Sequence, residues 1–356
     1  MSLAAWKPRL RRLALAALLA GLGGELGLRL VDAATGHRTG SLYQYVVFST
    51  SRSGVLRYKM APGARFFVPE RYGDIEYRFN ALGYRDRDHD PASSRPRLVI
   101  LGDSVSFGLG APQETIYARR LDEALGPRGW EVVNLAIFGY NSRDALEALR
   151  DDGLPMAPAV VLHQFYMNDL ATPAEAPTPP TPTLRQRLTA VKNRVTFASN
   201  LYRRAYQVAT GLAYHFGHDL KRLKVPERLN RAEVTHKSEY LAAHPEDADV
   251  PAFVALAEIF RLTREAGAQP VLMVSPDEVQ LIERQWDGIN ERLHRFAAAH
   301  GVPVIDLLPL LRGRPEWYRL FLDGVHLSPR AHGLVTEHLA AELARLGLLA
   351  PRSQDP

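Results

Sequence analysis

The sequence predicts an α/β fold in which a parallel β-sheet is covered by helices on both faces. Two observations support this prediction. From Arg97 onward, short apolar runs with the length of buried strands recur along the chain. Segments with the three- and four-residue apolar spacing of helices lie between these runs. Strands that alternate with helices in this way form parallel sheets whose two faces are both buried.

The first part of the alternation contains three strands and two helices. Leu98–Leu101 is an apolar run that ends at Gly102, as expected of a buried strand that leads into a turn. The elements that follow are predicted as a helix over Ile116–Leu125, a strand over Glu131–Leu135, a helix over Ser142–Arg150 and a strand over Ala159–Phe165.

The alternation resumes in the C-terminal third of the chain. The predicted elements are a helix over Ala252–Ala266, a strand over Pro270–Val274, a helix over Val279–His300, a strand over Val302–Leu307 and a closing helix over Ala331–Leu346. Two further strands therefore extend the same sheet, and the last helix covers it.

The composition narrows the class of protein. The chain has 356 residues, of which 46% are hydrophobic and 23% charged, and these ordinary values exclude wholesale disorder and a polytopic membrane protein. The absence of Cys excludes disulfides, thiolate zinc sites and a Cys nucleophile. The net charge of +5 comes from basic residues scattered among Asp and Glu, whereas a nucleic-acid surface gathers its charge on one face. We expect no nucleic-acid partner.

Residues 1–32 are typical of a targeting segment. Basic residues precede an apolar stretch: Lys7, Arg9, Arg11 and Arg12. Leu13–Gly24 has the length of a signal-peptide core, and Ala33 and Ala34 would suit cleavage. Alternatively, Leu13–Val31 is long enough to span a bilayer core of ~30 Å. Glu25 and Arg29 lie four residues apart and can then pair on one helix face.

We favour an uncleaved, single-pass anchor over a cleaved signal peptide that releases a secreted protein, and over a buried helix of a soluble domain. Because the basic flank stays on the cytoplasmic side, everything after residue ~32 would lie outside the cytoplasm. The expected location is the cell inner membrane, with the rest of the chain facing the periplasm or the exterior.

Three regions are expected after the anchor. Residues 40–95 are rich in turns and aromatic residues and predict a lead-in of short strands. Residues 96–350 form the main domain. Within it, residues 171–250 are an insertion: Ala171–Thr183 is rich in Pro, and residues 184–245 are basic and helix-rich. The helix-rich part is interpreted as an inserted helical pair, or alternatively as a membrane-surface helix or partner face.

Two segments that contain candidate catalytic residues follow the first two predicted strands. Ligands bind at this end of the strands in open α/β sheets. Gly102-Asp103-Ser104 places a Ser hydroxyl directly after a buried strand, although Asp or Ser also serves as an ordinary helix cap there. Gly139, in the loop after the second strand, can bring a backbone N–H close to a reacting group, although it is equally consistent with a plain loop glycine.

Two further segments complete the set. Asn168-Asp169 follows the third strand, where the Asn168 amide can donate to an oxyanion or simply form an Asx turn. Asp323 lies three residues before His326, so it can orient an imidazole that deprotonates Ser104. His326 and His332 lack a third ligand at the usual spacing, so we expect no zinc site.

In this order the four segments resemble the SGNH/GDSL hydrolase superfamily, whose blocks are a GDS segment, a Gly, a G-x-N-D segment and a C-terminal D-x-x-H. The resemblance covers about Arg97 to Leu346, apart from residues 171–250. Tyr166 stands where the family usually has Gly. The lead-in segment Asn80–Arg85 is also similar to a bacterial, membrane-anchored branch of the superfamily.

The resemblance implies a flavodoxin-like three-layer α/β/α fold and a serine hydrolase that cleaves acyl esters, O-acetyl esters among them, without a cofactor. Ser104 would be the nucleophile, His326 the general base and then acid, and Asp323 the group that orients it. The backbone of Ser104, the backbone of Gly139 and the side chain of Asn168 would form the oxyanion hole.

The expected substrate is an acylated small molecule or glycan. Two other functions remain open at this point: an acyltransferase that uses the same triad to acylate an envelope glycan, and a non-catalytic envelope scaffold or glycan-binding module. A nucleotide-binding protein is disfavoured because neither G-x-G-x-x-G nor a P-loop follows the first strand.

Overall fold

The computed structural model describes residues 3–36, 42–70, 73–170, 200–201, 204–205, 208 and 231–349. They belong to two compact units. One comprises Met1–Ser41, Arg65–Glu76 and Pro177–His218, and the other comprises Leu42–Ala64, Tyr77–Ala176 and Asp219–Pro356. The second unit contains the five-stranded sheet and every predicted site residue. The Pro-rich segment Ala171–Thr183 and most of the helix-rich segment after it lie outside the described residues.

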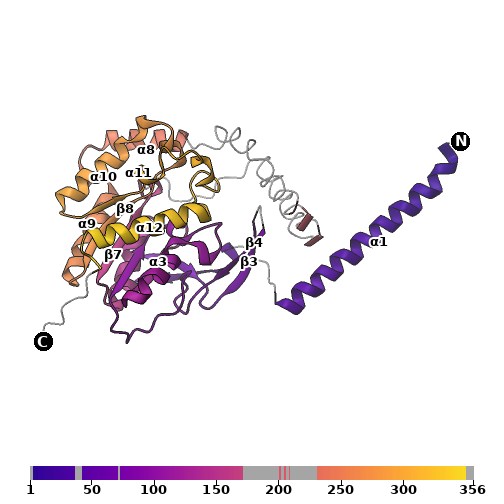
Figure 1. Ribbon diagram of the computed structural model, residues 1–356, viewed down its shortest axis with the longest axis horizontal. Coiled ribbons are helices and arrows are strands. Elements are labelled where there is room, and N and C mark those ends of the chain that lie inside the picture. The colour runs from indigo at the N-terminus through magenta and orange to yellow at the C-terminus, as the bar shows by residue number, and fades with distance from the viewer. Residues whose placement is uncertain are drawn as a thin grey trace. The chain divides into compact units, whose positions relative to one another are not determined.

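The five-stranded sheet is parallel throughout and confirms the predicted fold class (Figure 1). Its strands are β5 (Arg97–Leu101), β6 (Glu131–Asn134), β7 (Val160–Phe165), β8 (Gln269–Val274) and β9 (Val304–Asp306), in the spatial order β6-β5-β7-β8-β9. β5, the first strand in sequence, therefore lies between β6 and β7. The carboxyl ends of three strands that each precede a predicted site segment thus meet at one edge.

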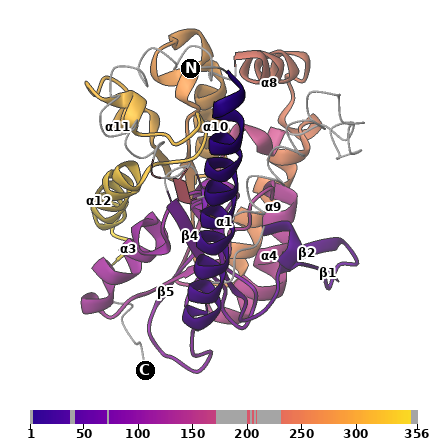
Figure 2. The ribbon, with the colours of Figure 1, turned by 90° about the vertical axis from the view of Figure 1, so that its right-hand side faces the viewer.

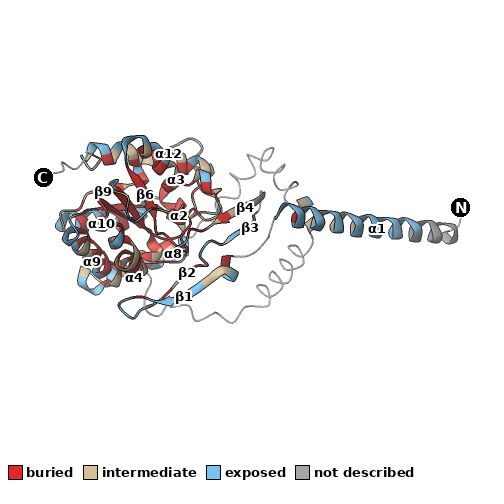
Figure 3. Ribbon diagram, turned by 90° about the horizontal axis from the view of Figure 1, so that it is seen from below, coloured by how far each residue is buried: buried red, intermediate tan, exposed pale blue. Residues whose placement is uncertain are grey.

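Helices cover both faces of the sheet (Figure 2). One face packs against α3 (Tyr117–Leu125), α11 (Leu308–Leu311) and α12 (Pro329–Arg345), and the other is covered by α4 (Ser142–Ala148), α9 (Pro251–Glu265) and α10 (Gly288–Ala299). Side chains alternate along each strand, so Leu98 and Ile100 of β5 enter the core under α3 and α12. All five residues of β5 are buried, as are those of β6 and β7 (Figure 3).

The helix predicted over Val279–His300 is wrong over its first nine residues. The structure has short 3₁₀ turns at Glu278–Leu281 and Arg284–Trp286, and α10 begins only at Gly288. A side-chain contact explains the interruption. The Gln280 carbonyl accepts hydrogen bonds from the Arg312 guanidinium instead of from a helical N–H. The apolar spacing did not reveal this competing donor, because Arg312 lies far away in the sequence.

The described residues between Leu42 and Arg78 form short strands and turns. After a 3₁₀ turn at Leu42–Tyr45, β1 (Val46–Thr50) and β2 (Leu56–Met60) pair as an antiparallel hairpin in which Phe48 is opposite Tyr58. β3 (Arg65–Glu70) and β4 (Gly73–Arg78) form a second two-stranded sheet. In the region predicted as an insertion, α8 (Arg231–Ala243) is helical, as are the described residues 200–201, 204–205 and 208.

The N-terminal segment is one helix, α1 (Leu3–Thr35). Within Arg12–Thr35, an 18-residue stretch has a mean hydropathy of 1.6, so this part of the helix is long and apolar enough to cross a membrane, criteria that a signal sequence also meets. The predicted pairing on one helix face is confirmed, because Arg29 Nε donates to Glu25 Oε1 over 2.7 Å. Apolar side chains from Leu13 to Val31 are exposed along the helix.

Candidate active site

Ser104 is the first residue of the short helix α2 (Ser104–Phe107), which starts where β5 ends. Asp103 Oδ1 caps this helix by accepting from Val105 N over 2.8 Å. Gly102 leaves room for the turn, since a Cβ there would lie 2.6 Å from Gln164 Oε1 and 2.7 Å from Ser106 Oγ. The turn therefore needs glycine because β7 supplies a side chain that packs directly against it.

Gln164 is the residue of β7 that fixes this turn. Its Oε1 accepts from Ser106 Oγ over 2.9 Å and from Asp103 N over 3.3 Å. Both hydrogen bonds are buried, and they tie the start of α2 to the neighbouring strand. Ser104 itself is only half-buried, so its hydroxyl is held at the edge of the sheet by a rigid turn.

Ser104, His326 and Asp323 form a continuous hydrogen-bonded chain. His326 Nε2 lies 2.8 Å from Ser104 Oγ, and His326 Nδ1 lies 2.7 Å from Asp323 Oδ2. The Asp323 Oδ1 atom accepts from the backbone N–H groups of Val325 and His326. Because a carboxylate can only accept, Nδ1 carries the ring proton and Nε2 is left to accept the proton of Ser104.

Electrostatics favour the ionised form of Asp323. Partial burial raises its pKa, but the hydrogen bond and the charge of His326 outweigh that effect and hold the pKa at about 2. More than half of the side chain is exposed to solvent, which weakens the influence of any single partner. Asp323 is thus an anion at neutral pH, as an acceptor beside an imidazole must be.

Asn168 lies in a 3₁₀ turn, Met167–Leu170, directly after β7. Asp169, buried in the same turn, accepts from Ser142 Oγ over 2.6 Å and from Tyr166 N over 2.9 Å and so holds the turn in place. Burial raises the pKa of Asp103, and the Val105 N–H, His326 and the Asn168 side chain oppose that rise. Asn168 therefore lies beside the segment that carries Ser104.

Gly139 lies in the loop after β6, and this loop is fastened to the start of α2. Ile137 N donates to Gly102 O over 3.3 Å, and Asn134 Nδ2 donates to Ser106 O over 3.0 Å. Gly139 has φ +78°, a left-handed conformation that favours glycine, and its backbone is exposed. The structure thus brings the loops of Gly139, Ser104 and Asn168 to the carboxyl ends of three adjacent strands, at one edge of the sheet.

The lead-in segment Asn80–Arg85 contacts the C-terminal end of α2. The Asn80 Oδ1 atom accepts from Leu82 N and Tyr84 N, which fixes the turn. Arg85 is buried, and its guanidinium donates to Phe107 O, Gly108 O and Ala111 O at the end of α2. The sequence drew attention to this segment, but only the structure shows that it holds the carbonyl end of the helix that starts with Ser104.

Tyr166 occupies the position where the resemblance leads one to expect Gly. Its Oη donates to Asp277 Oδ2 over 2.7 Å, and Asp277 Oδ1 caps the turn that follows β8 by accepting from Val279 N over 2.8 Å. Asp277 is 1% exposed. Burial raises its pKa to about 6, although both hydrogen bonds act in the opposite direction. The tyrosine therefore links the Asn168 turn to the loop after the next strand.

The pKa of Asp277 leads to a prediction on stability. The folded protein binds a proton at Asp277 more tightly than the unfolded chain, whose pKa is near 3.8. The stability that this proton supplies is present at low pH and is lost as the pH rises from about 4 through 6. A shift of this size corresponds to about 3 kcal/mol. Asp277→Asn should remove this component, so urea unfolding of the two full-length proteins at pH 4 to 7.5 should give diverging curves; parallel curves would contradict the assignment.

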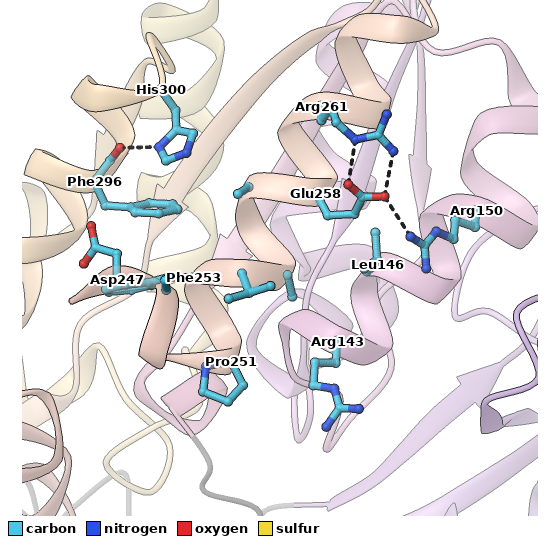
Figure 4. Close-up of a pocket in the computed structure, with 14 residues that line it drawn as sticks. Arg143, Leu146, Arg150, Asp247, Pro251, Phe253, Glu258, Arg261, Phe296 and His300 are labelled. Atoms are coloured by element: carbon cyan, nitrogen blue, oxygen red, sulfur yellow. Dashed lines mark hydrogen bonds and ion pairs between the residues drawn. The ribbon is translucent and has the colours of Figure 1, made fainter. Parts of the chain in front are cut away.

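A separate hollow of about 900 Å³ lies between α4, α9 and α10 (Figure 4). Leu146, Phe253 and Phe296 supply much of its apolar lining. On one side, Glu258 accepts from Arg150 and Arg261 over 2.8 and 2.7 Å, so these two cations are paired with an anion. The hollow contains none of the predicted site residues, so it is distinct from the Ser104 site.

Comparisons with known proteins identify the family of the chain. A family model described as the GDSL-like lipase/acylhydrolase family matches residues 100–334, which is more than half of the 356-residue chain. The comparison with curated proteins gave no match.

Among solved structures, the chain is similar to TesA (16% identity, TM-score 0.43, covering 70% of this chain and 99% of that chain). It is also similar to the psychrotrophic esterase EstA from Pseudoalteromonas sp. (14% identity, TM-score 0.40, covering 70% of this chain and 97% of that chain). A third similar structure is the lipase/acylhydrolase from Enterococcus faecalis (14% identity, TM-score 0.42, covering 70% of this chain and 96% of that chain). The strand order of the chain's own sheet carries the fold assignment.

Proposed function

The chain belongs to the GDSL-like lipase/acylhydrolase family and is an ester-hydrolysing serine hydrolase, and from this premise we propose that Ser104, His326 and Asp323 are its catalytic triad. We further propose that the enzyme acts outside the cytoplasm on acyl esters, including O-acetyl esters of small molecules or glycans. The observation that carries the proposal is the continuous hydrogen-bonded chain between Ser104, His326 and Asp323.

In the first half of the reaction, His326 Nε2 takes the proton of Ser104 as the hydroxyl oxygen attacks the ester carbonyl. Asp323 keeps the imidazole in the required tautomer and stabilises its charged form. The tetrahedral intermediate places a negative charge on the former carbonyl oxygen. That intermediate collapses when the C–O bond breaks and the proton on His326 passes to the leaving alcohol, which leaves an acyl group on Ser104.

In the second half, water replaces the alcohol. His326 accepts a proton from water, the resulting hydroxide attacks the acyl-enzyme, and a second tetrahedral intermediate forms. Its collapse returns the proton to Ser104 and releases the carboxylic acid. The oxyanion of both intermediates would be held by the backbone N–H groups of Ser104 and Gly139 and by the Asn168 amide, which come from the ends of three adjacent strands.

The chemistry is tested by rapid mixing of the purified full-length protein with p-nitrophenyl acetate. A covalent acyl-enzyme whose hydrolysis is slower than its formation gives a burst of p-nitrophenol close to one per active site. We expect this burst, followed by steady turnover. Acetate and p-nitrophenol released without formation of any acetylated protein, as judged by mass spectrometry after acid quench, would contradict a covalent mechanism.

The helix α1 supports the proposed location. An exposed apolar helix of this length is unfavourable in water, and a lipid bilayer would cover it. With Lys7, Arg9, Arg11 and Arg12 on the cytoplasmic side, the domain after α1 would face the periplasm or exterior. An alkaline phosphatase fused after residue 350 should therefore be active in cells, whereas a cytoplasmic reporter at the same site should be silent. The opposite pattern would reverse the topology.

A further inference from the structure

We propose that Tyr58, on the lead-in hairpin, is a positioning residue of the oxyanion hole: its hydroxyl fixes the direction and increases the donor strength of the Gly139 N–H. Tyr58 lies outside residues 100–334, the part of the chain that the family model matches. The inference rests on the proposed function, because it matters only if Gly139 stabilises an oxyanion.

The first observation is a hydrogen bond to the peptide unit that contains the Gly139 N–H. Tyr58 Oη donates to Phe138 O over 2.6 Å. No cis peptide bond occurs among the described residues, so the carbonyl of Phe138 and the N–H of Gly139 point in opposite directions. Holding the carbonyl toward Tyr58 therefore aims the N–H away from it.

The second observation is that this N–H has no hydrogen-bond acceptor among the described residues. Within the described ranges, the Gly139 N–H donates to no other residue, and the Gly139 backbone is exposed. A carbonyl that accepts a hydrogen bond polarises its peptide unit and makes the attached N–H a better donor. Tyr58 thus strengthens a donor that is free to bind a substrate oxygen.

The third observation is that the position of the Tyr58 hydroxyl requires glycine at residue 139. A Cβ at position 139 would lie 2.6 Å from Tyr58 Oη, so any other residue would displace the hydroxyl. Gly139 also has φ +78°, which strains a residue with a side chain. The loop can hold this conformation close to the hairpin only because the position is glycine.

The surroundings of Tyr58 keep its ring in place. Its ring meets that of Tyr140 edge-on with centroids 5.3 Å apart, and Tyr140 Oη donates to Tyr58 O. The Phe138 ring packs against Tyr58 on one side and against Phe107, the last residue of α2, on the other. The aromatic cluster therefore joins the hairpin, the Gly139 loop and the helix that starts with Ser104, so the hydroxyl is fixed relative to the nucleophile.

The test is Tyr58→Phe in the full-length protein, which removes only the hydroxyl. If Tyr58 orients the oxyanion donor, kcat and kcat/KM for p-nitrophenyl acetate should fall together by about tenfold, or about 1.4 kcal/mol in the barrier. KM should change less than twofold. The inhibition constant of a trifluoromethyl ketone, whose adduct with a serine bears an oxyanion, should rise by a similar factor.

Tyr84→Phe is the matched control. Tyr84 is a buried tyrosine of the same lead-in, and its Oη donates to Asp152 Oδ2 over 2.7 Å. Removal of that hydroxyl should lower the melting temperature but leave kcat and ketone inhibition unchanged in the folded fraction. If Tyr58→Phe behaves like this control, with kcat and inhibition unchanged, Tyr58 is a packing residue and the inference is wrong.

Separate outcomes would overturn the catalytic triad and the role of Tyr58. If Ser104→Ala leaves hydrolysis intact, the proposed catalytic triad fails. If Ser104→Ala abolishes hydrolysis but Tyr58→Phe leaves kcat unchanged, the triad stands and only the role of Tyr58 is lost. Should Tyr58→Phe lower the melting temperature, kinetics at a temperature where circular dichroism shows both proteins folded still separate positioning from stability.

Discussion

Replacing Ser104 with Ala should reduce kcat for acyl-ester hydrolysis by roughly 10⁶-fold, the usual effect of removing a triad nucleophile. The loss is large because, in the proposed mechanism, Ser104 Oγ forms the covalent bond to the acyl group after His326 Nε2, 2.8 Å away, takes its proton. Substrate affinity should change little, since the substitution removes one oxygen from a half-buried position. Steady-state kinetics of the purified full-length variant provide the measurement.

Ser106→Ala is the matched control for Ser104→Ala. Ser106 lies two residues along the same helix, but it is fully buried and its hydroxyl bonds to Tyr117 and Gln164 inside the protein. Its removal should lower stability by about 1–3 kcal/mol, because buried partners lose a hydrogen bond, and leave most of kcat in the folded fraction. Turnover by Ser104→Ala that matches the native rate would exclude the mechanism.

Replacing Asn168 with Ala should lower kcat and kcat/KM together by roughly 10²–10³-fold, the typical loss of one oxyanion donor. In the proposed mechanism the amide contacts a negative charge that exists only after Ser104 attacks, so KM should change little. Asn168 also opposes the rise in the pKa of Asp103, and its loss should make that buried carboxyl easier to protonate. Initial rates over a range of substrate concentrations, with a melting curve of the same preparation, give both quantities.

Asn134→Ala shows what a purely structural amide does at the same edge of the sheet. Asn134 is buried at the end of β6, and its Nδ2 donates to Ser106 O over 3.0 Å. We expect lower stability and a nearly normal kcat in the folded fraction. If Asn168→Ala also melts early and turns over normally, Asn168 is only a turn residue, and the backbone N–H groups of Ser104 and Gly139 are the remaining donors.

The sheet and the nucleophile segment could be predicted from the sequence because their determinants are local. β5 is an uninterrupted apolar run that ends at Gly102, and the residues after it are held by contacts that their own types suggest, such as the cap at Asp103. The same holds for Asp323 and His326, which lie three residues apart in one loop. Topology then brings that loop to Ser104, 222 residues earlier in the chain.

The supporting contacts could not be predicted because they depend on partners that are distant in sequence. Arg85 reaches the carbonyls at the end of α2, and Tyr58 reaches Phe138 across 80 residues. Neither contact leaves a periodic pattern. The helix that fails to form before Gly288 has the same kind of cause, since Arg312 takes the Gln280 carbonyl from outside the segment.

The most direct measurement of the central claim is fluorophosphonate labelling of the full-length protein, followed by mass spectrometry of the modified peptide. A fluorophosphonate reacts with a serine whose hydroxyl is activated by a neighbouring base. We expect a single adduct on Ser104 in the native protein and no adduct in Ser104→Ala. Labelling of His326→Asn should be much slower, because this variant lacks the base. An adduct on another serine, or equal labelling of the native protein and Ser104→Ala, would contradict the central claim.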